Sequence, residues 1–214
     1  NIRRESYLKF LNTWKNRDLI KVLSGVRRSG KSTLLAMFQQ DLKEQGVQDE
    51  NIIAINFEYM EFEELTDYRK LHDYVLSKVD KNKKNYVFLD EIQHVQNFEK
   101  VVDSLYIRDY IDLYITGSNA FFLSGELATL LTGRYIEQHV LPLSFQEFKQ
   151  WHTENNPTIQ QLSNRDLYAM YTRSSFPYTL AMTNQQETYD YLQAVYASVM
   201  FKDERWIRKF EQQL

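Results

Sequence analysis

Residues 25–33 read Gly-Val-Arg-Arg-Ser-Gly-Lys-Ser-Thr and match the pattern GxxxxGK[ST] at every fixed position. A triphosphate needs backbone N–H groups that converge on its oxygens, and glycine lets a loop wrap closely because it has no Cβ. An apolar run at residues 19–24 precedes the loop, and apolar residues at helical spacing follow it in residues 31–45. This strand–loop–helix order is the context in which the pattern indicates a phosphate-binding loop, or P-loop.

The side chains of the loop predict a nucleotide and a metal. Lys31 is expected to reach the β- and γ-phosphates of ATP, and the Ser32 hydroxyl to ligate Mg²⁺. The helix that starts near Gly30 presents free N–H groups and a positive dipole end to the same anion. The residues expected to bind the nucleotide are Gly25, Arg28, Ser29, Gly30, Lys31, Ser32 and Thr33.

A second apolar run, residues 86–91, reads Tyr-Val-Phe-Leu-Asp-Glu and ends in two acids. Ligands of open parallel sheets bind at the carboxyl ends of the strands. There Asp90 is expected to hold the metal through a water molecule or through another ligand, and Glu91 to polarise the attacking water. Acids are also common in surface turns that follow strands, and this is the alternative reading of the pair.

The spacing of apolar runs predicts an α/β fold. Strands are expected at 19–24, 52–57, 86–89, 113–116 and 135–141, and they alternate with helices. The helices are expected at 2–16, 31–45, 66–80, 97–110 and 120–132. This order predicts a three-layer P-loop nucleoside-triphosphatase sandwich with a mainly parallel five-stranded sheet.

After Pro142 the pattern changes to helices alone, at 144–155, 158–173 and 186–213. We therefore expect an ATPase core at 1–143 and a helical lid or connector at 144–214. The last helix reaches Leu214 without a stop signal, and the chain lacks an initiator Met. Both features favour a piece of a longer protein, with residues 144–214 as the start of a truncated C-terminal domain, although a natural C-terminal helix could also end in this way.

Composition excludes several classes of function. The 214 residues contain no cysteine, which removes disulfides, thiolate metal sites and cysteine nucleophiles. Four scattered histidines do not have metal-ligand spacing. No apolar stretch is long enough for a membrane span, and a cytoplasmic location is expected. The net charge of −3 argues against a dedicated nucleic-acid binder but leaves room for a local basic patch.

Several motifs together resemble a large prokaryotic family of AAA-like ATPases. They are Leu23–Ser32 around the loop, Leu89-Asp90-Glu91-Ile92-Gln93, Ile115-Thr116-Gly117-Ser118, Gly133-Arg134 and Leu141–Phe148. A strand between the loop and the acid pair, and a glutamate beside the aspartate, resemble the additional-strand, catalytic-glutamate division, which includes STAND-type ATPases. The guanine-reading motif Asn-Lys-x-Asp is missing, since residues 82–85 read Asn-Lys-Lys-Asn, so ATP is favoured over GTP.

The resemblance also suggests two further catalytic residues. Residues 114–119 resemble the sensor strand of AAA+ proteins, in which Asn119, or second Ser118, reads the γ-phosphate; either residue could equally cap the next helix. Arg134 could neutralise the transition state, in cis or from a neighbouring subunit, or form an ordinary surface ion pair. Relatives usually carry two glycines where this chain has Ser174-Ser175 before Phe176-Pro177, which puts the local turn in doubt.

The function expected from these features is Mg²⁺-dependent ATP hydrolysis that drives a switch or motor. The alternatives are a regulatory module that binds ATP without hydrolysing it and, with less support, a nucleic-acid translocase. The expected partners are ATP and either an unknown protein or the chain's own missing domain, with oligomer formation left open.

Overall fold

The computed structural model describes residues 2–117, 131–155, 162–182 and 184–197. The chain divides into two compact units: residues 30–141 make up most of the first, and residues from Pro142 on make up most of the second. The expected helix at 120–132 lies almost wholly outside the described residues.

The first unit contains a five-stranded sheet in which every strand pair is parallel. The strands are β1 (Ile20–Ser24), β2 (Ile52–Asn56), β3 (Asn85–Asp90), β4 (Ile111–Gly117) and β5 (Tyr135–His139). Their order across the sheet is β2-β3-β4-β1-β5. The predicted α/β fold with a parallel five-stranded sheet is confirmed, and the strand boundaries differ from the predicted ones by only a few residues.

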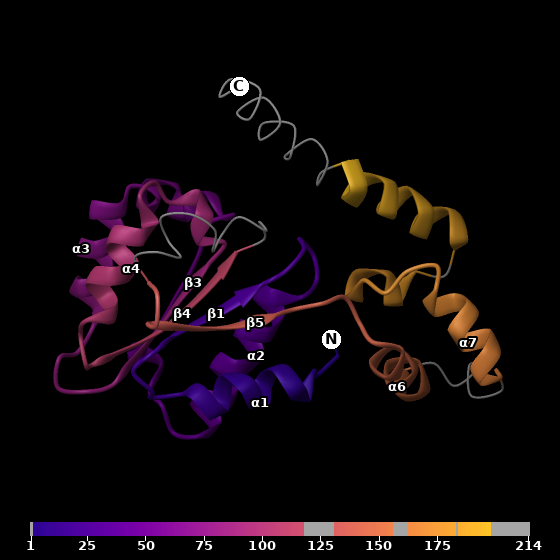
Figure 1. Cartoon of the computed structure of the whole chain (residues 1–214), viewed down its shortest axis with the longest axis horizontal. Coiled ribbons are helices and arrows are strands. Elements are labelled where there is room, and N and C mark those ends of the chain that lie inside the picture. The colour runs from indigo at the N-terminus through magenta and orange to yellow at the C-terminus, as the bar shows by residue number, and fades with distance from the viewer. Residues whose placement is uncertain (1, 118–130, 156–161, 183, 198–214) are drawn as a thin grey trace. The chain divides into compact units, whose positions relative to one another are not determined.

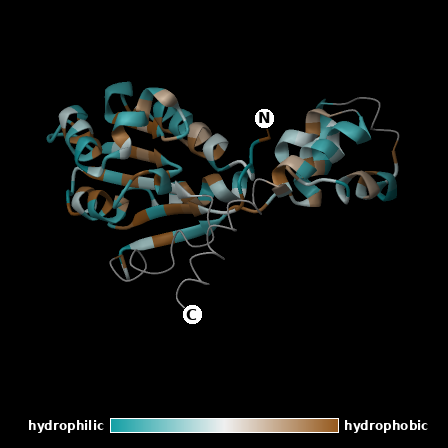
Figure 2. Cartoon of the chain, turned by 90° about the horizontal axis from the view of Figure 1, so that it is seen from above, coloured by the Kyte–Doolittle hydropathy of each residue, from teal (hydrophilic) through white to brown (hydrophobic). Residues whose placement is uncertain are grey.

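Helices cover both faces of this sheet (Figure 1). The helices are α1 (Glu5–Trp14), α2 (Lys31–Glu44), α3 (Tyr68–Lys78) and α4 (Phe98–Tyr106). One face packs its aliphatic side chains against α3 and α4, with Val87 and Leu89 of β3 among them. The other face packs Tyr86, Phe88 and Tyr114 against α1 and α2. In Figure 2 the strands are largely brown and lie between helices whose outer faces are largely teal. Successive side chains of β3 alternate between the two faces, so Asp90 lies on the same face as Tyr86 and Phe88.

The strand order refines the expectation of an extra strand. The strand near residues 52–57 exists, but as β2 it lies at the edge of the sheet. The strand that separates the P-loop strand β1 from the acid-bearing strand β3 is β4. The sequence order of strands therefore does not reveal which strand is inserted in space.

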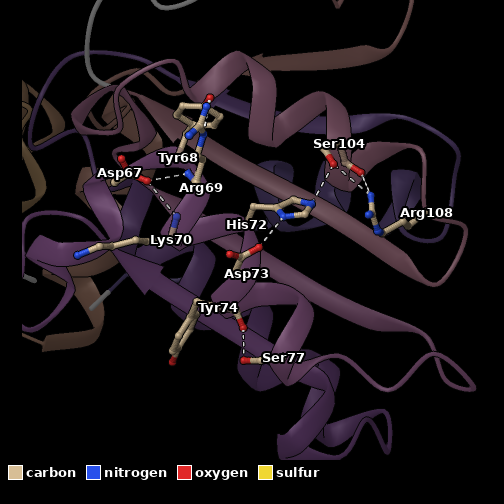
Figure 3. Close-up of polar contacts among 10 residues, drawn as sticks. All are labelled: Asp67, Tyr68, Arg69, Lys70, His72, Asp73, Tyr74, Ser77, Ser104 and Arg108. Atoms are coloured by element: carbon tan, nitrogen blue, oxygen red, sulfur yellow. Dashed lines mark hydrogen bonds and ion pairs between the residues drawn. The ribbon is translucent and has the colours of Figure 1, made fainter.

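Polar contacts fix the start of α3 and join it to α4 (Figure 3). The Asp67 side chain caps α3 by accepting hydrogen bonds from the backbone N–H groups of Arg69 and Lys70. His72 of α3 lies 3.1 Å from the Ser104 hydroxyl of α4 and 3.2 Å from the Asp73 carboxylate. The two helices therefore share a polar contact at their surface in addition to the aliphatic core beneath.

The second unit is helical where it is described. It contains α6 (Phe145–Asn155), α7 (Asn164–Tyr171), a 3-10 helix (Pro177–Ala181) and helical residues 185–197. Ser163 and Asp166 form a capping box at the start of α7, and Leu143, Phe148 and Leu180 lie in the unit's core. Ser174 and Ser175 are absent from the residues with positive φ, so the turn there does not require the two glycines of the resemblance.

Candidate functional site

The P-loop leaves β1 at Gly25, where glycine is required by the neighbouring strand. Gly25 has φ +140°, and a Cβ placed there would lie 2.3 Å from the carbonyl oxygen of Val140, just after β5. The same two segments are joined by a 2.7 Å hydrogen bond from Val140 N–H to the Ser24 carbonyl. Close packing of the chain on itself is therefore a second reason for this glycine, beside the expected approach of phosphate. Gly30, with φ +102°, forms the N-cap of α2.

Lys31, the first residue of α2, points back into the loop and is buried. Its Nζ donates hydrogen bonds to the carbonyl oxygens of Gly25 (3.1 Å) and Val26 (3.2 Å). The same Nζ lies 3.5 Å from Oε1 of Glu91. Burial lowers the pKa of Lys31, and the Glu91 carboxylate opposes that shift. The ammonium group is thus held at the carboxyl edge of the sheet, next to the predicted catalytic acid.

Asp90 ends β3 on the face that α1 and α2 cover, because it follows Tyr86 and Phe88 at a spacing of two residues. This position brings its carboxylate to the Ser32 hydroxyl, with which it forms a hydrogen bond. Burial raises the pKa of Asp90, and the hydrogen bonds from Ser32 and Thr116 act in the opposite direction. The two residues predicted to hold the metal are therefore brought together.

Glu91 lies just beyond the strand in an unusual backbone conformation. Its φ is +56°, in the left-handed region, and only 6% of the residue is exposed. Its backbone N–H donates a 2.9 Å hydrogen bond to the Thr116 hydroxyl. The Gln93 side-chain amide donates to the Glu91 carboxylate. The backbone turn and these contacts place the carboxylate beside Lys31.

Two residues that the sequence analysis did not assign complete this cluster. The Thr116 hydroxyl donates to Asp90 while accepting from Glu91 N–H, so one side chain positions both acids. Asn56, at the end of β2, donates a 2.9 Å hydrogen bond to Oδ2 of Asp90. Both are polar residues at the carboxyl ends of apolar strands, and this signal was available for each of them.

Arg134 is not brought to this cluster. Its carbonyl accepts from Ile20 N–H at the amino end of β1, opposite the P-loop. Five strand residues separate the two edges, a distance of roughly 16 Å. The Arg134 guanidinium instead pairs with Asp103 and lies over the ring of Tyr106. This geometry does not support a role in cis, whereas a role toward a neighbouring subunit stays a prediction.

The remaining predicted residues are placed only in part. Ser118 and Asn119 lie outside the described residues. Arg28 has φ +67°, Ser29 is buried and Thr33 is half-buried. Their contacts with a nucleotide stay predictions.

The oxygen atoms at the sheet edge suit Mg²⁺, which prefers hydroxyl, carboxylate and water ligands. The Ser32 hydroxyl and the Asp90 carboxylate already converge. Among the described residues no group of three or more His, Cys, Asp or Glu side chains could hold a metal by itself. In the same described ranges, no helix combines the length and apolar character of a membrane span.

Two curated relatives match the chain in sequence. It is 40% identical over 204 residues to an uncharacterized protein of Haemophilus influenzae, a match that covers 94% of the chain and 50% of that relative. It is 38% identical over 141 residues to an uncharacterized protein of Methanocaldococcus jannaschii, with coverage of 64% and 29%. The chain thus spans half the length or less of these relatives.

Solved structures agree on the fold. The Walker-type ATPase of Pyrococcus abyssi superposes with a TM-score of 0.61 at 16% identity, covering 100% of this chain and 77% of that one. AMPPCP-bound DnaA from Aquifex aeolicus gives 0.53 at 12% identity, with coverage of 99% and 68%. A family model described as AAA domain matches residues 17–149, which contain the P-loop, the acid pair and all five strands. The chain therefore belongs to the AAA-domain family of P-loop ATPases.

Proposed function

We propose that the chain binds ATP and hydrolyses it with Mg²⁺, and that hydrolysis drives a conformational switch or motor. The observation that carries this proposal is the convergence of four groups at one edge of the sheet. They are the Lys31 ammonium, the Ser32 hydroxyl and the carboxylates of Asp90 and Glu91, joined by the Lys31–Glu91 pair and the Ser32–Asp90 hydrogen bond.

Nucleotide binding would rearrange Lys31. Its oxygen neighbours include two loop carbonyls and one carboxylate, and the β- and γ-phosphates offer more strongly charged acceptors. As Lys31 turns to the phosphates, its hold on Glu91 weakens. The Glu91 carboxylate then accepts a hydrogen bond from the attacking water and orients it.

Ser32 and Asp90 would hold Mg²⁺, which supplies charge neutralisation between the phosphates. Thr116 and Asn56 keep the Asp90 carboxylate in one orientation. Thr116 also fixes the backbone of Glu91, so the metal ligand and the water-orienting acid stay in a constant relation. These hydrogen bonds hold the reacting groups in a productive geometry before the reaction begins.

The alternative is a regulatory module that binds ATP and does not turn it over. The presence of a buried carboxylate next to Lys31 favours hydrolysis. A translocase on nucleic acid is the weaker candidate, because the net charge of −3 argues against nucleic-acid binding and the family model matches one AAA domain. The first relative is about twice as long as this chain, so the output of the whole protein, a switch or a motor, is part of the proposal. Oligomer formation and a cytoplasmic location are also part of the proposal.

Glu91→Gln separates hydrolysis from binding. The change keeps size and hydrogen bonding but removes the basic oxygen, and positioned general-base groups contribute about 10²–10⁴-fold. Phosphate release should fall by about that factor, while ATP affinity measured by calorimetry should persist. The matched control is Glu61→Gln, an exposed acid of the 3-10 helix Met60–Thr66 after β2, which should change neither quantity.

Two outcomes would contradict the proposal. Equal turnover by wild type and Glu91→Gln would remove Glu91 from the reaction. Tight ATP binding by a wild type without turnover, even in a chain extended to the full length of its relatives, would favour the binding module.

A further inference from the structure

The helical unit contains a pocket that the nucleotide site does not use. Its volume is about 510 Å³, within the range of small-molecule sites, and all of its lining residues belong to this unit. They come from α6, α7, the 3-10 helix, helical residues 185–197 and the segments that connect these helices. The apolar part of the lining consists of Phe148, Met170, Met182, Tyr189 and Leu192.

His152 of α6 lines this pocket and lacks a hydrogen-bond partner for its Nδ1 among the described residues. Only 5% of the residue is exposed. Burial lowers the pKa of His152, which keeps the imidazole neutral near pH 7. Since a buried polar nitrogen is unfavourable without a partner, this side chain indicates a ligand that brings one.

A polar wall faces the apolar part of the lining. Ser174 and Thr179 are both buried, and the Thr179 hydroxyl donates a 2.7 Å hydrogen bond to the Ser174 hydroxyl. Hydroxyl groups can donate and accept, so this wall suits a ligand atom of either kind. The neighbouring Asn184, Gln185 and Thr188 extend the wall.

The lining of the pocket carries positive charge and no negative charge. Arg173 is its one charged residue, and no Asp or Glu contributes. The Arg173 guanidinium forms no ion pair within the part of the chain that the structure describes. A guanidinium binds a carboxylate through two parallel hydrogen bonds. One cation matches one negative charge, so a monoanion fits better than a doubly charged phosphate.

We propose that this pocket binds a small organic carboxylate, with the carboxylate on Arg173 and an apolar body against Phe148, Met170 and Leu192. The buried His152 imidazole, together with the Ser174–Thr179 wall, then hydrogen-bonds polar atoms of the ligand. This site shares no lining residue with the P-loop, and the proposal does not depend on ATP hydrolysis.

The test titrates the chain, without nucleotide, with hexanoate and 3-phenylpropionate, and in parallel with the uncharged amide of each. Calorimetry gives the affinity, and the ¹⁵N resonances of the His152 ring report on the pocket itself. Both acids should bind saturably and shift the His152 signals. The amides should bind about tenfold or more weakly, because the charge-assisted hydrogen bonds are lost.

Arg173→Gln should weaken the acids by a similar factor and leave the amides unchanged. Arg165→Gln is the matched control, because Arg165 is an exposed arginine of α7 outside the pocket. The proposal is overturned if neither acid saturates at millimolar concentration, if amides bind as well as acids, or if Arg165→Gln has the same effect. Saturable binding that leaves the His152 resonances unmoved would also overturn it, and this readout needs no variant that could misfold.

Discussion

Lys21 and Lys31 are both buried lysines paired with a carboxylate, yet they occupy opposite edges of the same sheet. The side chains are 0% and 2% exposed, and burial lowers the pKa of each lysine against the effect of its acid. Lys21 of β1 pairs with Asp112 of β4 at the amino edge. Lys31 lies near Glu91 at the carboxyl edge.

The two pairs differ in what surrounds the acid and the amine. Asp112 also accepts from Tyr114 Oη (2.7 Å) and Asn16 N–H (3.0 Å), while Lys21 donates to the Arg17 carbonyl (2.9 Å). Of these partners Tyr114 lies in the core, and Asn16 and Arg17 lie in the segment that joins α1 to β1. The Lys31 partners include loop carbonyls and one carboxylate at 3.5 Å, which a phosphate can replace. Burial and a shifted pKa alone therefore do not identify a functional lysine.

Arg134 gives the largest expected effect and tests whether the amino edge takes part in hydrolysis at all. If it acts on a neighbouring subunit, Arg134→Ala should reduce turnover by about 10³-fold or more without loss of ATP binding. Specific activity of the wild type should also rise with protein concentration. Arg165→Ala serves as the control. A flat concentration dependence, with unchanged turnover in the variant, would leave Arg134 as the partner of Asp103 alone.

Asp112 tests the structural side of the comparison. Asp112→Ala leaves Lys21 buried without its carboxylate, which should cost about 3–5 kcal/mol in the free energy of unfolding. Urea denaturation measures this cost. The double variant Lys21→Met/Asp112→Leu should recover most of it, because well-packed apolar residues can replace a buried pair. The exposed Asp109→Ala is the control, and an equal loss there would contradict a special role for the pair.

Lys31 tests the functional side. Lys31→Ala should weaken ATP roughly 10- to 150-fold, since hydrogen bonds to charged groups contribute about 1.5–3 kcal/mol. Its urea transition should shift far less than that of Asp112→Ala. Lys43→Ala, at the exposed end of α2, removes a lysine from the same helix and should leave affinity intact. Unchanged ATP affinity in a folded Lys31 variant would refute the P-loop assignment.

Substitution of Ser32 gives the smallest expected effect on ATP affinity. It tests whether the Ser32 hydroxyl, at the carboxyl edge of the sheet, is a ligand of Mg²⁺. Ser32→Ala should weaken ATP about three- to tenfold in the presence of Mg²⁺, the value of one ordinary hydrogen bond. The same variant should bind ATP like wild type when a chelator removes Mg²⁺. Ser77→Ala on α3 is the control. A loss that is equal with and without Mg²⁺ would separate Ser32 from the metal.

The sequence alone predicts most of this architecture because strand and helix periodicities are local properties. The P-loop, Asp90 and Glu91 were recognised from short motifs, and their convergence follows from parallel strands that end at a common edge. The position of β4 between β1 and β3 and the remoteness of Arg134 depend on strand order, which local patterns do not encode. Thr116 and Asn56 also carry the signal of a polar residue at a strand end, but the groups with which they form hydrogen bonds depend on how neighbouring strands align.

Glu91 illustrates a conflict between folding and chemistry at a single position. A residue with a Cβ in the left-handed region costs roughly 1–2 kcal/mol, and glycine would adopt φ +56° without that cost. Random mutagenesis that selects only for thermal stability should therefore enrich glycine at position 91 and yield robust proteins without turnover. A stabilised version of this domain should therefore keep Glu91, the residue directly after β3, unchanged.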